Sequence, residues 1–306
     1  MRRSLVTSAI VAVSLALTAC ANAPGPGSSE DARRAVMDAF RRTAEAGSAR
    51  ATFELTANVQ GRTIDLSGIA EYQMDPHDPS SLRERVVLQI PPLTFGATGG
   101  EVEMRVTEGP VLYVRAPMFA NYLNVSTPWL KLDPSETPSA GDSSAALGSM
   151  AGLTDPAALL GMLEGSVSAE TIGIDQVDGA KATHYQVTVD VASALETFVN
   201  AVRGPERKRM AATLPTVQAK LKAAGLQELP FDVWVDGAGF LKRMRASFDL
   251  SKLEPQGPPP SISMTITLSD VGAPVAVQPP PADQVTDITH LMPATSTTST
   301  TSTTST

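Results

Sequence analysis

The chain has 306 residues, 42% of them hydrophobic, with 24 Lys and Arg against 32 Asp and Glu and a formal net charge of −8. An acidic chain is a poor candidate for binding nucleic acid, which demands a basic surface, or for holding to an anionic membrane by charge alone. Its single cysteine excludes an internal disulfide, so a domain of this length must be held together by a hydrophobic core.

The N-terminus has the features of a secretory signal peptide. Arg2 and Arg3 precede an apolar run from Leu5 to Leu17, which is too short to span a bilayer as a helix, because spanning takes ~20 apolar residues. The run ends at Leu17-Thr18-Ala19-Cys20, which resembles the lipobox of bacterial lipoproteins. This resemblance implies that Cys20 receives diacylglycerol carrying chains such as palmitate, and that residues 1–19 are removed. The alternative is an ordinary signal peptide with an incidental cysteine.

Residues 20–29 are rich in Ala, Pro, Gly and Ser and predict a flexible tether between the lipid and the domain. Ser28 and Ser29 can cap a helix, and the apolar residues between Ala32 and Thr43 then recur at helical spacing until Gly47 ends it. Arginines surround the other face, where we expect solvent; contact with lipid headgroups is the alternative. They are Arg33, Arg34, Arg41 and Arg42.

From residue 51 the apolar period changes to two, which is typical of strands with one buried face. Residues 51–59 and 64–72 predict a hairpin around Gln60-Gly61-Arg62, and residues 83–90, 101–107, 111–115 and 129–132 predict further strands. Because short turns join them, an antiparallel meander is expected, since parallel pairing needs long crossovers.

The second half is predicted to mix helices and strands. The ranges are a loop at 133–150, a helix from Asp155-Pro156 to Gly165, strands at 167–174 and 181–191, helical residues 192–224 broken at Gly204-Pro205 and at Pro215, a hairpin at 231–250 and a strand at 262–268. In the hairpin, Phe240, Lys242 and Met244 are predicted to share the apolar face. Residues 291–306 are almost pure Ser and Thr and are expected to be disordered.

The order of several weak motifs resembles one lipoprotein family. The motifs are the lipobox, a Trp129 strand before a loop, Val177-Asp178-Gly179 before Thr183-His184-Tyr185, Val233-Trp234-Val235-Asp236 before Gly239-Phe240, and a Pro-rich exit at Pro279-Pro280-Pro281. This order resembles the actinobacterial LppX/LprG-type lipoproteins, which share the fold of the carriers LolA and LolB. The resemblance implies an α+β domain over residues 30–290, in which a strongly curved antiparallel sheet of about 11 strands forms a half-open barrel. Helices would cover its concave face.

The resemblance further implies an apolar cavity that holds acyl chains of lipids or lipoglycans, and a role in moving them across the cell envelope. The protein would sit on the outer face of the plasma membrane, anchored through acylated Cys20, with an envelope transporter as a possible partner. The residues expected to line the cavity are Phe53, Leu55, Val59, Ile64, Leu66, Val102, Met104, Val106 and Leu160. Patterning does not distinguish a cavity from a packed core, because both need the same apolar residues.

The sequence offers little catalytic chemistry. His77, His184 and His290 are far apart, and neither a zinc-binding His/Cys spacing, a nucleophile elbow nor a phosphate-binding glycine loop occurs. We therefore predict no enzyme, cofactor or metal, although carboxylates gathered in space would be compatible with an enzyme. The main alternative to a lipid carrier is an envelope scaffold with a filled core that acts through its surface.

Overall fold

The computed structural model describes residues 28–59, 61–92, 99–109, 111–116, 125–133, 136, 167–201, 205–249, 251 and 260–289. The predicted helix at 155–165, the loop at 133–150 apart from residues 133 and 136, the signal peptide, Cys20 and the Ser/Thr tail lie outside these ranges. Within them, no helix has both the length and the apolar character needed to cross a membrane.

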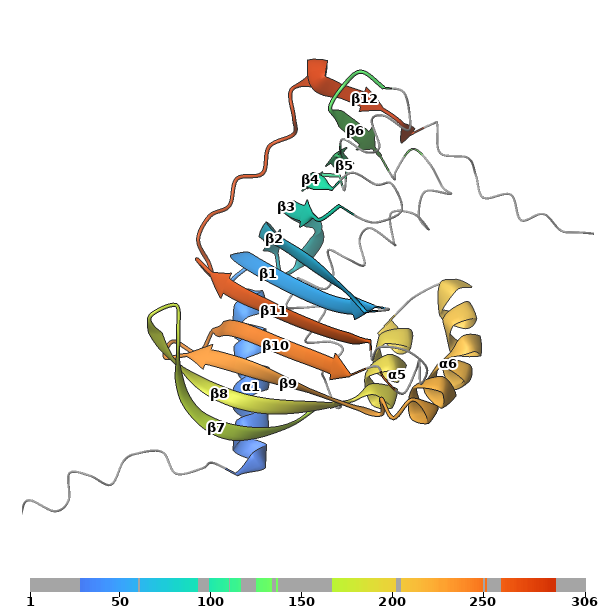
Figure 1. The fold of residues 1–306 in the computed structure, drawn as a ribbon. Helices are drawn as coiled ribbons and strands as arrows, with labels where there is room; N and C mark the ends of the chain where they lie inside the picture. The colour runs from blue at the N-terminus through green and yellow to red at the C-terminus, as the bar shows by residue number, and fades with distance from the viewer. Residues whose placement is uncertain are drawn as a thin grey trace, which may run out of the picture.

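Twelve described strands form one curved and twisted sheet (Figure 1). They are β1 Ser48–Val59, β2 Arg62–Asp75, β3 Asp78–Ile90, β4 Gly100–Thr107, β5 Val111–Arg115, β6 Trp129–Leu132, β7 Val167–Val177, β8 Ala180–Asp190, β9 Glu228–Asp236, β10 Leu241–Asp249, β11 Ser261–Ser269 and β12 Val285–Asp287. The spatial order is β12-β6-β5-β4-β3-β2-β1-β11-β10-β9-β8-β7. The predicted α+β fold with a broad, mostly antiparallel open sheet is confirmed.

The sheet departs from a simple meander in two places. The first strand, β1, is not an edge strand, because it pairs with β11 on the side away from β2. The last strand, β12, pairs with β6 in parallel. The strand β12 was missed in the sequence because it is three residues long and its partner lies more than 150 positions earlier in the chain. So short a strand has no detectable period of its own.

The helix α1, Ser29–Glu45, forms as the sequence predicts. The Ser28 hydroxyl accepts a hydrogen bond from the Asp31 amide at 3.2 Å, which satisfies one of the open donors at the helix start. Gly47, with a φ of +70°, allows the turn into β1. The apolar face of α1, with Val36 and Phe40 fully buried, crosses behind β8–β10 (Figure 1) and packs mainly on β7.

Two further described helices follow β8. They are α5, Val191–Ala201, and α6, Pro205–Ala223. The prediction that Pro215 breaks the second helix is wrong, since α6 continues through it. An internal proline removes one backbone hydrogen bond, and here the flanking residues remain helical in spite of that loss.

The β9–β10 hairpin forms around the predicted Asp236–Gly239 turn, but its inner face differs from the prediction. The register shifts between Leu241 and Arg243, so Leu241 pairs with Val235 and is 1% exposed, whereas Met244 pairs with Val233. The bulge changes which side chains of β10 point to the inner face. A prediction that assumes regular alternation from Phe240 does not include this shift.

After β11 the chain runs past the ends of the strands along one side of the sheet as a strap, residues 270–281, and then forms a short 3-10 helix at Ala282–Gln284 before β12 (Figure 1). The Ser48 hydroxyl donates to the Ala273 carbonyl at 2.8 Å, the Val275 amide donates to Gln73, and Arg105 donates to the Gln278 carbonyl at 3.0 Å. These bonds hold a proline-rich segment that cannot form a regular ladder of its own.

Candidate functional site

The inner face of the sheet carries an apolar surface that continues across neighbouring strands. The register places Leu55 opposite Leu66, Leu88 opposite Val102, and Met104 opposite both Val86 and Val114. Directly opposed residues in an antiparallel pair share a face, so these rows extend from β1 to β5 on one side of the sheet.

Seven of the predicted lining residues lie on this inner face. They are Phe53, Leu55, Ile64, Leu66, Val102, Met104 and Val106. Val59 ends β1, opposite Arg62, whereas Leu160 lies outside the described residues.

The degree of burial varies along the inner face. Ala51, Ala70 and Val102 are buried at 6% exposure or less. In contrast, six of the predicted residues are half-buried: Phe53, Leu55, Ile64, Leu66, Met104 and Val106. The apolar surface is therefore closed at some points and partly accessible at others, while α1 has its main contacts at the β7 end of the sheet.

Glu84 is a polar residue on this face that the sequence patterns did not single out. It is 3% exposed, and the register places it opposite Tyr72 on β2 and Val106 on β4. The signal was present in the sequence, because Glu84 interrupts the alternating apolar positions Leu82, Val86 and Leu88.

A separate pocket of about 260 Å³ lies between the first residues of α5 and the last residues of α6. Its lining residues are Val191, Ala192, Glu196, Gln218, Ala219, Leu221, Lys222, Leu226 and Gln227. The Gln218 amide donates to Glu196 at 3.1 Å across the two helices. The seven predicted residues on the inner face do not line this pocket.

The outer face of β3–β5 is organised around Glu103, whose side chain is 3% exposed. Arg85, Arg105 and Arg115 approach its carboxylate at 2.7, 2.8 and 2.6 Å. Burial alone would raise the pKa of Glu103, but hydrogen bonds from the three guanidinium groups outweigh it and lower the pKa to about 2. Arg105 and Arg115 also lie over the ring of Trp129, which joins β6 to the same cluster.

A second outer-face cluster surrounds His184 on β8. The His184 Nε2 lies 2.9 Å from Asp232, Nδ1 lies 3.1 Å from Asp175, and the imidazole stacks on Trp234 at 4.4 Å. Burial raises the pKa of Asp232, but hydrogen bonds from His184 and Arg245 lower it overall. Both ring nitrogens of His184 thus have carboxylate partners, so the ring is not positioned as a free general base.

The described residues contain no group of three or more His, Cys, Asp or Glu side chains arranged to bind a metal ion. The carboxylates nearest to His184 lie on opposite sides of its ring, because each contacts a different nitrogen. The cluster therefore ties β7 and β9 to β8 across the outer face.

Comparison with known proteins gives matches among solved structures. No protein-family model matches the sequence, and no curated protein matches it. The structure is similar to that of LprF from Mycobacterium bovis, at 17% identity and a TM-score of 0.43, over 83% of this chain and 98% of that one. It is also similar to the Mycobacterium tuberculosis lipoprotein LppX, at 16% identity and a TM-score of 0.42, over 81% and 99%.

A third match is MucB, solved in complex with MucA(peri), at 13% identity and a TM-score of 0.32, over 83% of this chain and 58% of that one. At these identities the likeness concerns the path of the chain, so ligand and role must be argued from the residues of this protein.

Proposed function

We propose that this protein is an extracytoplasmic lipoprotein, anchored through acylated Cys20, that binds the acyl chains of a lipid or lipoglycan against the inner face of its sheet and takes part in their transport across the envelope. The observation that supports binding is the partial exposure of Phe53, Leu66 and Met104 on a mainly apolar face. In a filled core such side chains are closed off from water; against a ligand chain they would be covered only when the ligand is bound.

The energetic argument is favourable to acyl chains. Each methylene removed from water contributes ~0.8 kcal/mol, so a chain of about 16 carbons contributes more than ~10 kcal/mol before the ordering cost of binding is subtracted. The face offers apolar surface on several strands at once, which suits a long flexible chain better than a compact polar metabolite. In this proposal the protein has no enzymatic activity and needs no cofactor.

An envelope scaffold is the second candidate. It is favoured by the buried inner-face residues Leu88, Val102 and Leu112, each at 7% exposure or less, which pack as a conventional core. Organic extraction of the purified protein followed by mass spectrometry separates the two candidates. A carrier releases about one lipid per protein, whereas a scaffold releases none.

Anchoring has its own test. Replacement of Cys20→Ala should leave an uncleaved or soluble protein that lacks the mass increment of the lipid. A variant that stays acylated and membrane-bound would overturn the proposed anchor.

A further inference from the structure

The helix α6 concentrates positive charge in an acidic protein. Five of the 24 Lys and Arg residues of the chain, but only one of its 32 Asp and Glu residues, lie within Pro205–Ala223. The basic residues are Arg207, Lys208, Arg209, Lys220 and Lys222. The chain as a whole has a net charge of −8, but the helix α6 is locally positive.

This helix is exposed to an unusual degree. Thirteen of the 17 side chains from Arg207 to Ala223 are exposed and none is buried. The four half-buried ones, Met210, Leu214, Gln218 and Leu221, recur at helical spacing. Among the described elements α5 is the main packing partner of α6, so these four form the inward stripe, and next to it Ala219 and Lys222 line the pocket between the two helices.

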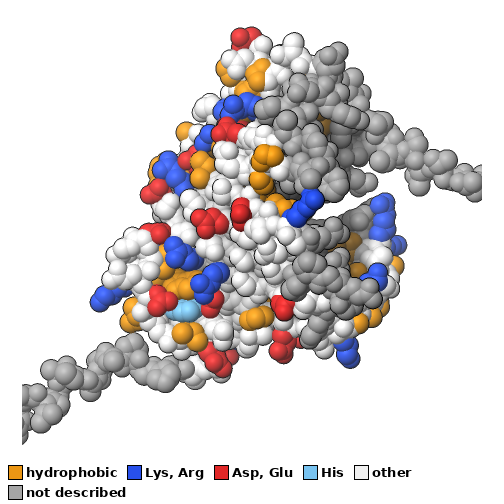
Figure 2. All heavy atoms as spheres, in the orientation of Figure 1, with side chains coloured by type: hydrophobic (Ala, Val, Ile, Leu, Met, Phe, Trp, Pro, Cys, Tyr) orange, Lys and Arg blue, Asp and Glu red, His pale blue; other side chains and the backbone are white. Residues whose placement is uncertain are grey.

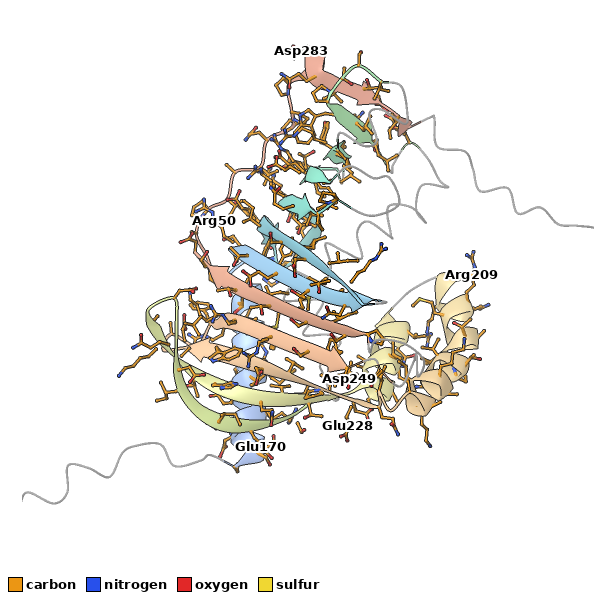
Figure 3. All side chains as sticks on the ribbon, in the orientation of Figure 1. Arg50, Glu170, Arg209, Glu228, Asp249 and Asp283 are labelled. Carbon is orange, nitrogen blue, oxygen red and sulfur yellow. The ribbon has the colours of Figure 1, made fainter. Side chains whose placement is uncertain are left out.

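The figures show how the basic side chains lie. In Figure 2 Lys and Arg side chains, with apolar side chains between them, follow the outer edge of α6 at the right of the molecule. Figure 3 labels Arg209 at the end of α6 that projects from the body of the protein. Val217, at 40% exposure, adds apolar surface to the same helix.

Helix stability does not explain this charge. Lys220 and Lys222 lie in the last turn, where the helix dipole favours cations. Arg207, Lys208 and Arg209 lie at the opposite end, where the dipole disfavours them. Arg207 donates to Asn200 at 3.0 Å, which accounts for one member of this cluster. Lys208 is exposed at the same end, and a cation there, which the helix dipole opposes, is better explained by an external anionic partner.

We propose that the exposed side of α6 docks onto an anionic phospholipid surface. Attraction is about 1 kcal/mol for each Lys or Arg near such a surface, and the acidic remainder of the protein is repelled, so the same charges bind and orient the molecule. A neutral or zwitterionic surface offers no such attraction. The proposal concerns the outside of the protein and does not depend on whether its inner face holds lipid.

The test is co-sedimentation with vesicles of the mature chain, from residue 20 onward, with Cys20→Ala so that neither an acyl chain nor the apolar run from Leu5 to Leu17 can contribute. Vesicles of phosphatidylcholine with phosphatidylglycerol are compared with vesicles of phosphatidylcholine alone. The unaltered α6 should bind the phosphatidylglycerol vesicles more strongly, and added salt should weaken this binding. The double variant Lys208→Glu/Lys220→Glu should reduce it at least about tenfold.

A matched control carries the same change of charge elsewhere. Arg62 and Lys181 are exposed residues of β2 and β8, and Arg62→Glu/Lys181→Glu should retain most of the binding. Melting curves establish that both variants fold, and Lys208→Gln/Lys220→Gln should bind at an intermediate level. Equal losses in the two charge-reversed variants, or equal binding to both kinds of vesicle, would overturn the proposal. Unchanged binding of the α6 variant would also overturn it and would favour an acidic protein as the partner of this helix.

Discussion

At the residue scale, Glu103 shows how a buried charge is stabilised by its surroundings. A carboxylate that is 3% exposed is unfavourable alone, but three guanidinium groups within 2.8 Å compensate for its lost hydration. Removing the charge would leave three arginines facing one another across β3, β4 and β5. The carboxylate is thus necessary for the outer face around Trp129 to keep its arrangement.

We expect Glu103→Gln to reduce the free energy of unfolding by about 2–3 kcal/mol at neutral pH. Because the folded pKa of about 2 lies below the ordinary value of 4.5, the stabilisation is complete above pH 4.5 and is lost as the pH falls towards 2. Urea unfolding should therefore show the two proteins converging over that range. Glu101→Gln is the control, because Glu101 is 45% exposed and should matter little. A pH-independent difference between the two proteins would refute this explanation.

Gly68 on β2 is the second residue with a specific structural requirement. A Cβ at this position would overlap the ring of Phe53 and the carbonyl oxygen of Val87. The ring of Phe53 occupies the space that a side chain would take, which brings Phe53 close to the backbone of the inner face.

We therefore expect Gly68→Ala to destabilise the protein by about 1–3 kcal/mol through overpacking. Gly173→Ala on β7 is the matched control, because nothing lies within 4 Å of its Cβ position, and should change stability by less than about 0.5 kcal/mol. Thermal or urea unfolding measures both. If the two substitutions had equal effects, the Phe53 contact would not be the reason for the glycine.

At the scale of elements, α1 is fixed to the sheet by a hydrogen bond as well as by its apolar face. Thr43 is fully buried; its hydroxyl donates to the Ala39 carbonyl at 2.8 Å and accepts from the Leu241 amide at 3.0 Å. This amide lies at the bulge of β10, where the regular pairing with β9 is interrupted. Thr43 thus satisfies a donor that the bulge leaves outside the ladder.

Replacement of Thr43→Val keeps the shape but leaves the Leu241 amide without this acceptor, and should cost about 1–3 kcal/mol. Thr43→Ser retains the hydroxyl and should lose less. Hydrogen exchange of the Leu241 amide provides a direct readout, with faster exchange expected in the valine variant alone. Slow exchange in that variant would mean that the amide has another acceptor.

Elements with a strong local signal were predictable from the sequence, and those set by distant contacts were not. The cap at Ser28 and the alternation of β1 and β2 identify these elements directly. The parallel strand β12 depends on β6, and the bulge at Leu241 depends on how β9 and β10 meet, so neither leaves a local pattern. The predicted break at Pro215 was wrong because proline only tends to end a helix, and an otherwise helical segment can continue through it.

For the candidate site, the face on which each side chain lies within its strand was predictable, whereas the pairing between strands was not. Alternation places Phe53 and Leu55 on one face of β1 whatever the register, but only the pairing of β1 with β2 and of β3 with β4 brings Leu66, Val102 and Met104 to that side of the sheet. Whether such a face is a packed core or a ligand-binding wall depends on what covers it, and the apolar pattern is the same in both cases. The basic surface of α6 was hidden by the total charge, although a count of charges by segment would have revealed it.

At the scale of the whole molecule, the structure separates three surfaces. The inner face is apolar, the outer face is held by ion pairs around Glu103 and His184, and α6 carries positive charge beyond the edge of the sheet (Figure 2). We propose that the anchor keeps the domain at the membrane, that α6 orients it, and that the inner face holds acyl chains. The last of these roles is the central claim.

The most direct test measures the lipid that organic solvent extracts from purified protein, per mole of chain, in a pair of variants at neighbouring positions of β1. Leu55 lies on the inner face and Glu54 on the outer face, so Leu55→Trp should block an acyl chain while Glu54→Trp leaves it in place. We predict about one lipid per protein in the wild type and in Glu54→Trp, and a large loss in Leu55→Trp with a cooperative melting transition retained. Equal lipid content in both variants, or a wild type without lipid, would contradict the proposed binding of acyl chains.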